Sequence, residues 1–338
     1  MPSLCVIPGD GIGQEVIPAA VRVLRAVIPD LETITAEAGW DCFQRTGSSL
    51  PEATLQAVRD CGAGLFGAVS SPSCKVPGYR SAILQLRREL DLYANIRPVR
   101  SWPGVSPRAD VDLIVVRENT EGLYSGIERS DGQTAVAERI ITRAASERIA
   151  RRTAELVRLN GRRCITIVHK ANVLSLTDGL FRDSVCSVLR ASDPTLVIEE
   201  LLVDVAALKL LAEPQGFDTI VTTNLFGDIL SDEAAYWGGG LGMAPSLNWG
   251  DSLGVAEPVH GSAPDIAGQG LANPIAAMLS GALLARYVWG NEPAAVAIES
   301  AIFTALAARL DLSSGTAAIT EAVLEQIDFP GIQGFPGK

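Results

Sequence analysis

The chain has 338 residues, of which 47% are apolar and 20% charged, so it is long enough for two globular domains at about 100–200 residues each. Its formal net charge of −11 argues against a nucleic-acid partner, because phosphate binding requires clustered Lys and Arg. An acidic chain that binds an acidic substrate must build a local positive site, so a tight group of arginines is informative here.

The elements predicted along the chain alternate between strands and helices. Short apolar runs predict strands at 4–7, 65–69, 92–96, 111–116, 164–168 and 219–223, and Pro98 should end the third of them. Helical spacing of apolar residues predicts helices at 15–27, 83–90, 144–160, 272–289 and 293–309. This alternation predicts an α/β protein with a largely parallel sheet. The segment 99–108 is the best candidate for a linker, and a second crossing is expected near Gly250.

Three features indicate a cytoplasmic protein with no membrane partner. The six cysteines form no C-x-x-C pair and are expected to be reduced thiols. The chain enters a predicted strand almost at once, so no signal peptide is visible. The apolar stretch 274–287 is interrupted and shorter than the roughly 20 residues of a membrane-spanning helix, so it predicts a buried helix.

A glycine motif, Gly9-Asp-Gly-Ile-Gly13, follows the first predicted strand and opens a helix, where dinucleotide-binding motifs occur. The G-x-G-x-x-G pattern is incomplete, because Gln14 or Val16 stands in the place of the last glycine. No acidic residue follows the second strand in a clear ribose-binding position. We favour a tight turn that brings the backbone close to a ligand or another loop, with a phosphate cradle as the alternative.

Three arginines lie at or near the predicted ends of elements. Arg87 is on the helix 83–90, Arg97 closes an extended segment and Arg117 ends the apolar strand 111–116. Ligand crevices of open α/β sheets form at the carboxyl ends of strands, and the arginine fork matches a carboxylate. The alternative is a structural ion pair for each arginine. The three together favour a carboxylate site.

An aspartate pair follows the strand 219–223. Asp228 and Asp232 are four residues apart, so a helix places both on one face, where a cation between them would offset their repulsion. Hard oxygen ligands suit Mg²⁺ or Mn²⁺. Asp204 follows another apolar run and is a candidate third ligand. In the alternative interpretation Asp228 caps the helix and Asp232 is solvated.

Two further side chains could move protons. Lys170 stands at the end of the strand 164–168, where burial and nearby cations could lower its pKa. Tyr124 follows the loop after Arg117 and could donate a proton. Either residue taken alone also fits a structural role.

A glycine-rich segment, 257–274, has few charges and suits close approach of the backbone to a ligand. Asp265 could accept hydrogen bonds from a ribose diol and would repel a 2′-phosphate. The alternative is a long surface loop, but the glycine content favours a binding loop.

Taken in order, these segments resemble the β-decarboxylating dehydrogenases, which include isocitrate, 3-isopropylmalate, homoisocitrate and tartrate dehydrogenases. The resemblance covers nearly the whole chain. Its motifs are Ile7-Pro-Gly-Asp-Gly-Ile-Gly, Leu90-Asp-Leu-Tyr-Ala-Asn-Ile-Arg-Pro, Arg117-Glu-Asn-Thr-Glu-Gly-Leu-Tyr124, His169-Lys-Ala-Asn172, Thr223-Asn-Leu-Phe-Gly-Asp-Ile-Leu-Ser-Asp232 and His260-Gly-Ser-Ala-Pro-Asp-Ile-Ala-Gly268.

The resemblance implies an isocitrate/isopropylmalate dehydrogenase-like fold, with two α/β domains around a mixed sheet, and not a Rossmann fold. Residues 1–98 and 250–338 would form a cofactor-binding domain, and 99–249 a central domain for dimerisation, metal and substrate. NAD would lie along the loop 260–273, facing the loop 70–78, because Asp265-Ile266 resembles the NAD-using version of this loop. The implied cofactor-binding residues are Ser71, Glu257, His260, Gly261, Ser262, Ala263, Asp265, Ile266 and Asn273.

The resemblance also implies a mechanism with active sites shared in a homodimer, or in a tetramer built from such dimers. Arg87, Arg97 and Arg117 would bind the substrate together with Ser81 and Asn172. Mg²⁺ or Mn²⁺ would bind Asp228, Asp232 and the partner's Asp204. The partner's Lys170 would assist removal of the hydroxyl proton, and Tyr124 would protonate the enol carbon after CO₂ leaves.

The segment ahead of Arg87 carries the implied specificity for a tricarboxylate-type substrate. Isocitrate enzymes have an asparagine at the position of Ile83, and some bacterial homoisocitrate enzymes have an arginine at that of Leu84. Ser81, with Arg80, would meet a distal carboxylate. The pattern most resembles homoisocitrate dehydrogenase of lysine biosynthesis. The alternatives are 3-isopropylmalate dehydrogenase of leucine biosynthesis and NAD-dependent isocitrate dehydrogenase.

Two other classes are disfavoured. A catalytically dead ligand-binding homologue should lack at least one residue that the chemistry requires, but Lys170, Tyr124 and the three aspartates are present. A magnesium-dependent phosphoryl-transfer enzyme should show a P-loop motif, which the sequence lacks.

Overall fold

The computed structural model describes residues 1–74 and 76–327, which fall into two compact units. Unit 1 comprises Met1–Leu92, Trp102–Ser106 and the described residues from Gly239 onward; unit 2 comprises Tyr93–Ser101 and Pro107–Gly238. Both termini of the described chain therefore belong to unit 1. The main changes of unit fall at Leu92/Tyr93 and Gly238/Gly239, ahead of the sequence-based boundaries of 98/99 and 249/250, and Trp102–Ser106, expected in the central domain, belongs to unit 1.

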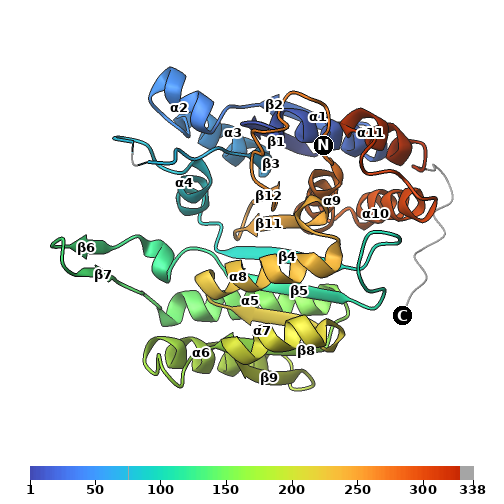
Figure 1. Cartoon of the computed structure of the whole chain (residues 1–338). Coiled ribbons are helices and arrows are strands. Elements are labelled where there is room, and N and C mark those ends of the chain that lie inside the picture. Colours follow the sequence, from blue (N-terminus) through green and yellow to red (C-terminus); the bar gives the residue numbers. More distant parts are fainter. Residues whose placement is uncertain (75, 328–338) are drawn as a thin grey trace. The chain divides into compact units, whose positions relative to one another are not determined.

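Unit 1 is built on five strands in the order β2-β1-β3-β12-β11 (Figure 1). Neighbouring strands are parallel except β11 and β12, which pair antiparallel. The strands are β1 (Ser3–Gly9), β2 (Glu32–Thr35), β3 (Ala63–Ala68), β11 (Pro245–Trp249) and β12 (Gly254–Pro258). The fully buried β3 is apolar throughout, as expected for a parallel strand covered on both faces.

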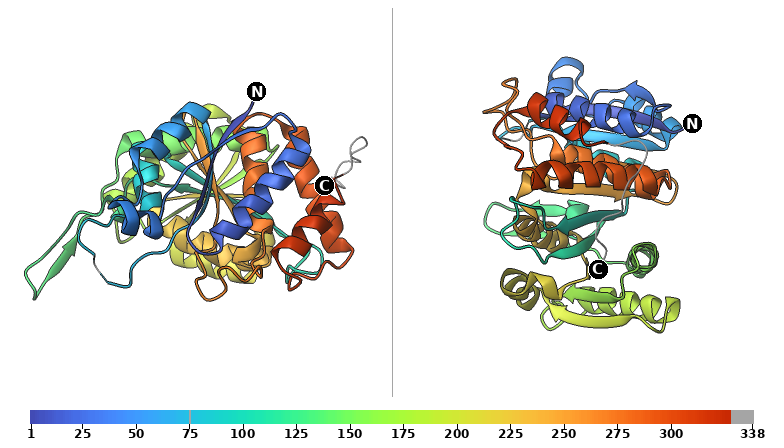
Figure 2. Two further views of the ribbon diagram at one scale, coloured as in Figure 1. Left: turned by 90° about the horizontal axis from the view of Figure 1, so that it is seen from above. Right: turned by 90° about the vertical axis from the view of Figure 1, so that its right-hand side faces the viewer.

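Helices cover both faces of these strands (Figure 2). α1 (Gly13–Val27) and α9 (Ile275–Leu283) pack on one face, with α10 (Glu292–Ala307) and α11 (Thr316–Leu324) behind them. On the other face, α3 (Glu52–Cys61) and α4 (Ala82–Glu89) share a core with β1 and β3. The short α2 (Trp40–Thr46) precedes α3.

Unit 2 has five strands in the order β4-β5-β10-β8-β9, again with one antiparallel pair, β4 and β5. The strands are β4 (Ala94–Arg100), β5 (Asp112–Glu118), β8 (Cys164–His169), β9 (Val197–Leu202) and β10 (Thr219–Thr222). A separate two-stranded arm, β6 (Glu128–Ser130) with β7 (Ala135–Ala137), extends from this unit (Figure 1).

The helices of unit 2 form two layers around its strands. α7 (Val203–Ala212) and α8 (Asn224–Ala235) share a buried apolar core with β4, β5, β8 and β10. α5 (Arg143–Leu159) and α6 (Thr177–Ser192) pack against each other and contact β5 and β8. The expected α/β class with a mixed, largely parallel arrangement is confirmed.

The prediction that Pro98 ends its strand is wrong, because β4 continues to Arg100. Pro98 lies opposite Ile114, and the N–H of Ile114 donates to Asp218, on the side of β5 away from β4. Residues 98 and 114 are therefore a non-hydrogen-bonded pair, and a proline at this position removes no bond between β4 and β5.

The helix predicted over 272–289 is shorter than expected. It begins at Ile275 and ends at Leu283, and a π-helical segment, Leu284–Val288, follows it. No helix in the described part of the chain is both long and apolar enough to span a membrane. All six cysteines are free, and burial raises the pKa of Cys5 to about 12. The expectation of free thiols is confirmed.

Candidate active site

In unit 2, polar side chains meet where β5 and β10 end. These strands are parallel neighbours with Arg117 in register with Thr222, so the start of α8 lies beside the end of β5. α8 begins at Asn224 and presents Asp228 and Asp232 one helical turn apart. This placement at the carboxyl edge of the strands agrees with the position of ligand sites in α/β sheets.

Two buried arginines contact the aspartate pair directly. Arg97 donates through Nη1 to Asp232 Oδ1 at 2.7 Å, and its Nη2 lies 3.4 Å from Asp228 Oδ1. Arg117, 1% exposed, pairs with Asp228 Oδ1 and also donates to Asn224 Oδ1 at 2.7 and 3.0 Å. The structure therefore brings together two residue sets that the sequence assigned to different ligands.

Gly227 makes the contact between Arg117 and α8 possible. A Cβ at this position would lie 2.6 Å from Arg117 Cγ and 2.7 Å from its Cβ, closer than real side chains approach. The absence of a side chain at Gly227 lets the buried part of Arg117 lie against the helix. This fixes the guanidinium beside Asp228.

Tyr124 joins the same cluster from the short 3₁₀ helix Leu123–Ser125. Its hydroxyl donates to Asp228 Oδ2 at 2.6 Å, and Arg117 lies over its ring at 5.0 Å from the centroid. Burial raises the pKa of Tyr124, and the hydrogen bond to Asp228 raises it further. The phenol is thus a proton donor that stays protonated at neutral pH.

Lys170 and Asp204 form a second polar group in unit 2. Lys170 follows β8, Asp204 lies in the first turn of α7, and their side chains make an ion pair. This hydrogen bond from Lys170 lowers the pKa of Asp204. Asn172, two residues beyond Lys170, is exposed. In the described residues of one chain no three acidic, His or Cys side chains gather as around a metal, so Asp204 does not join Asp228 and Asp232 there.

In unit 1, Arg87 forms a buried ion pair with Glu257. Arg87 Nη2 on α4 lies 2.8 Å from Glu257 Oε1 on β12, and that oxygen also accepts from Asn248 Nδ2 at 2.8 Å. Arg87 Nε is buried and has no hydrogen-bond partner among the described residues. The expected substrate-binding arginine and the expected cofactor-binding glutamate thus contact each other.

The glycine motif supports the expected cofactor loops. Ile12 N donates to Ser262 O at 2.9 Å, and a Cβ on Gly11 would lie 2.1 Å from that oxygen. Asp10, which is 2% exposed, accepts from Ser70 N at 2.8 Å, and Ser70 Oγ lies 2.9 Å from Ser262 Oγ. The expected close approach of this turn to another loop is confirmed.

The rest of the expected cofactor loop is accessible in part. Gly261 and Asp265 are exposed, Ile266 is half-buried, and Ala263 has a left-handed φ of 39°. Burial lowers the pKa of His260. The remaining candidates are placed as follows: Asn273 just before α9, Ser71 exposed in the loop after β3, and Ser81 at the start of α4.

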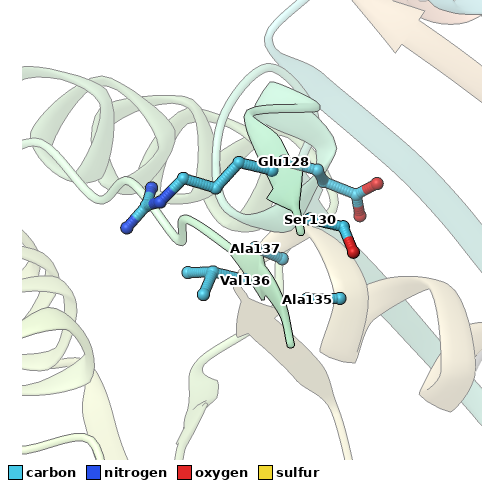
Figure 3. A pocket seen from close by; sticks show the side chains of 6 residues that line it. Glu128, Ser130, Ala135, Val136 and Ala137 are labelled. Atoms are coloured by element: carbon cyan, nitrogen blue, oxygen red, sulfur yellow. The ribbon is translucent and has the colours of Figure 1, made fainter. Parts of the chain in front are cut away.

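A hollow of about 290 Å³ lies on the two-stranded arm, and none of these residues lines it (Figure 3). Glu128, Arg129 and Ser130 of β6 and Ala135–Ala137 of β7 line it. None of these residues was a sequence candidate. The arginine–aspartate cluster is therefore the candidate active site.

Sequence reasoning missed several supporting residues. Asn224 and Ser231 orient the arginines, and Asp10 and Glu15 anchor the loops; Glu15 Oε1 accepts from Gly268 N at 2.6 Å. Asp10 had a signal, since it stands between Gly9 and Gly11 of the glycine motif. Glu15 had none, because only the folded chain brings it to Gly268.

These features define an α/β protein with its polar residues at strand ends. The sequence profile described as "Isocitrate/isopropylmalate dehydrogenase" matches residues 3–327, and the chain belongs to this family. It is 51% identical to the isocitrate/homoisocitrate dehydrogenase of Thermus thermophilus over 96% of this chain and 98% of that protein. It is 50% identical to the 3-isopropylmalate dehydrogenase of Methanothermobacter thermautotrophicus over 90% of each. The solved isocitrate dehydrogenase of Methylococcus capsulatus superposes with a TM-score of 0.91 at 39% identity, over 97% of this chain and 99% of that one.

Proposed function

We propose that the protein catalyses the NAD-dependent oxidative decarboxylation of a malate-type 2-hydroxy acid, with homoisocitrate, converted to 2-oxoadipate in lysine biosynthesis, as its substrate. The contact of two buried arginines with two aspartates on one face of α8 carries this proposal. Few reactions need anion-binding and cation-binding groups so close together. A hydroxy acid chelated to a divalent cation is a ligand that uses both.

The ion pairs of the cluster are replaced by a ligand of matching charge. Substrate carboxylates take the place of Asp228 and Asp232 beside Arg97 and Arg117, because guanidinium forks bind either kind of carboxylate. The aspartates are then available to a cation. The buried arginines move little in this exchange, so the site is organised in advance for the acid.

The donor set fits the divalent metal that the family implies. Asp228 and Asp232 supply hard oxygens from side chains that are 33% and 53% exposed, and the partner's Asp204 completes the set. Mg²⁺ or Mn²⁺ bound there supplies Lewis-acid polarisation of the substrate oxygen through oxidation and decarboxylation. NAD bound along the loop 260–273 supplies the hydride acceptor.

Two residues of the chain move the protons. Lys170 of the partner subunit takes the hydroxyl proton through water, which sets the alcohol up for loss of hydride. Tyr124 returns a proton to carbon after CO₂ leaves, and its raised pKa keeps the phenol protonated for this step. Arg97 and Arg117 hold the carboxylates throughout.

Exposed apolar side chains support a dimer. Val205, Leu208 and Leu211 on α7 and Ile229 on α8 are 39–66% exposed. Such a patch on neighbouring helices marks a protein interface. The arm β6–β7 is marginal as an isolated hairpin and would also gain from a partner. We place this dimer, or a tetramer of such dimers, in the cytoplasm, where its six thiols stay reduced.

The substrate assignment depends on the start of α4. Ser81 stands before the helix, and Ile83 and Leu84 are half-buried in its first turn. A hydroxyl beside two apolar groups suits a distal carboxylate on a longer chain, with Arg80 near it. The names of the two relatives keep isocitrate and 3-isopropylmalate as alternatives, and one methylene is worth only about 1–3 kcal/mol of discrimination.

The test is NADH formation with Mg²⁺ and, separately, homoisocitrate, isocitrate and 3-isopropylmalate. We expect the highest kcat/KM for homoisocitrate. A preference for 3-isopropylmalate would mean that Ile83 and Leu84 form an alkyl pocket and that the enzyme belongs to leucine biosynthesis. Ser81→Ala is the companion variant, expected to lower kcat/KM for homoisocitrate more than for 3-isopropylmalate.

A further inference from the structure

An ion pair in unit 2 between a fully buried aspartate and a half-buried arginine has no part in the proposed mechanism. Asp178, in the first turn of α6, is fully buried, and its Oδ1 lies 2.7 Å from Nη2 of Arg139. The contact is electrostatic, because no N–H of Arg139 points at that oxygen. Burying two charges is costly and contributes little net stability, so such a pair calls for another explanation.

Asp178 holds the backbone of Lys170. Its second oxygen, Oδ2, accepts the N–H of Lys170 at 2.6 Å. The carbonyl of Lys170 accepts from Val173 N at 3.0 Å and Leu174 N at 2.8 Å. Both backbone groups of Lys170 are thus fixed by the segment that leads into α6, and this fixes the direction in which its side chain leaves the end of β8.

Arg139 links the same carboxylate to the start of α8. Its Nη2 donates to Thr223 Oγ1 at 3.0 Å, and its guanidinium lies 4.8 Å from the centre of the Phe226 ring. Thr223 immediately precedes α8, the helix that carries Asp228. Arg139 therefore connects the segment that holds Lys170 with the helix that holds the metal-binding aspartates.

We propose that Asp178 and Arg139 are positioning residues that hold Lys170 as the proton acceptor. This inference rests on the proposed function of Lys170. Because Lys170 serves the partner's site and Asp228 its own chain's site, Arg139 also joins elements of two active sites in the dimer. If Asp178 and Arg139 served stability alone, their contacts would not affect the rate of proton transfer to Lys170.

The test begins with Asp178→Asn, which keeps an oxygen for Lys170 N–H and removes the charge. We expect kcat to fall about 10–100-fold, with KM for both substrates within about threefold, because misplacing a reacting group costs this much. The solvent deuterium isotope effect on kcat should rise as proton transfer becomes limiting. Asp183→Asn is the matched control on α6, since Asp183 is exposed and forms an ion pair with half-buried Arg182; it should leave kcat unchanged.

A double-mutant cycle with Lys170→Met separates positioning from stability. If Asp178 acts through Lys170, Asp178→Asn lowers kcat in the wild type and changes it little in the Lys170→Met background. An equal fall in both backgrounds, or a lower Tm with unchanged kcat, would overturn the inference. If Asp178→Asn does not fold, Arg139→Lys takes its place in the cycle with the same expectations. If the wild type is active and Lys170→Met leaves kcat unchanged, the proposed role of Lys170 is refuted. If the wild type itself has no activity, the proposed function is refuted.

Discussion

Asp228 is the residue on which the cluster in unit 2 depends most. Its carboxylate accepts from Arg117, Arg97 and Tyr124, so one side chain links the residues proposed to bind the anion, bind the metal and donate the proton. The carboxylate of Asp228 can lie beside the partly buried Tyr124 because the positive charge of Arg117 offsets its negative charge. The arrangement holds the phenol of Tyr124 in its protonated form.

Tyr124→Phe should lower kcat by about 10²–10⁴-fold, the usual contribution of a general acid. KM for the hydroxy acid should change only a few-fold, because Arg97 and Arg117 remain. Steady-state kinetics of NADH formation measures both constants. A kcat within twofold of the wild type would show that another group, or water, protonates the product.

The two histidines of the chain give its stability a predictable pH dependence. Burial lowers the pKa of both His169 and His260. The unfolded chain therefore binds more protons than the folded one below about pH 6.5, and the free energy of unfolding falls as the pH drops through that value. The lowered carboxyl pKa values act only at more acidic pH, and the raised pKa values of Glu121 and Glu233 act in the opposite direction to the histidines.

The expected outcome is a lower Tm at pH 5.5 than at pH 7.5, in a buffer pair of matched ionic strength. The His169→Gln/His260→Gln double variant should show a smaller difference between the two pH values. An identical difference in wild type and variant would assign the pH dependence to other groups.

Among elements, α8 shows how a helix can depend on one glycine. Gly227→Ala would press a methyl group against Arg117, which is buried and cannot move aside. We expect a loss of about 1–3 kcal/mol in the free energy of unfolding, the cost of overpacking, together with reduced activity.

Gly179→Ala on α6 is the control for this substitution, because a Cβ there meets nothing within 4 Å. It should stabilise the protein by about 0.5–1 kcal/mol through helix propensity. Denaturant unfolding measures both variants. Equal effects of the two substitutions would show that Arg117 can shift without loss of stability and that its contact with Gly227 does not hold it in place.

The strands and helices differ in how far the sequence predicted them. Buried apolar strands such as Asp112–Glu118 and amphipathic helices such as Arg143–Leu159 were found within a few residues. β9 was missed, because Val197–Leu202 is partly exposed and lacks a buried apolar run. The arm β6–β7 was missed for the same reason, since all six of its residues are exposed.

The site was predicted as a set of residues but not as a set of contacts. Motifs identified Arg87 and Glu257 separately, and nothing in a sequence indicates that side chains 170 positions apart will pair. The pairing of Arg97 and Arg117 with Asp228 likewise depends on strand order. Sequence patterns report what a residue can do, whereas the fold decides which residue it meets.

In the whole molecule, the proposed mechanism requires two chains for one active site. Lys170→Met and Asp228→Asn homodimers should each retain only a small residual activity, for different reasons. Mixed dimers of the two variants should regain one intact site, made of the aspartates of one chain and Lys170 of the other. Random reassembly at equal concentrations should therefore restore about a quarter of the wild-type activity.

Reassembly needs two controls. In one, each variant is dissociated and reassembled alone; in the other, the two homodimers are mixed without dissociation. Activity that stays at the level of the homodimers after true mixing would mean that each chain completes its own site. Leu208→Asp adds an independent check at the exposed face of α7, where a charge should yield inactive monomers in size-exclusion chromatography with light scattering.

The most direct measurement of the central claim is the stoichiometry of the reaction. Released CO₂ and formed NADH are quantified together during complete turnover of the preferred hydroxy acid in the presence of Mg²⁺. We expect one CO₂ for each NADH, with both lost in the Asp228→Asn variant. NADH without CO₂, or no NADH from any malate-type acid, would contradict oxidative decarboxylation at the arginine–aspartate cluster.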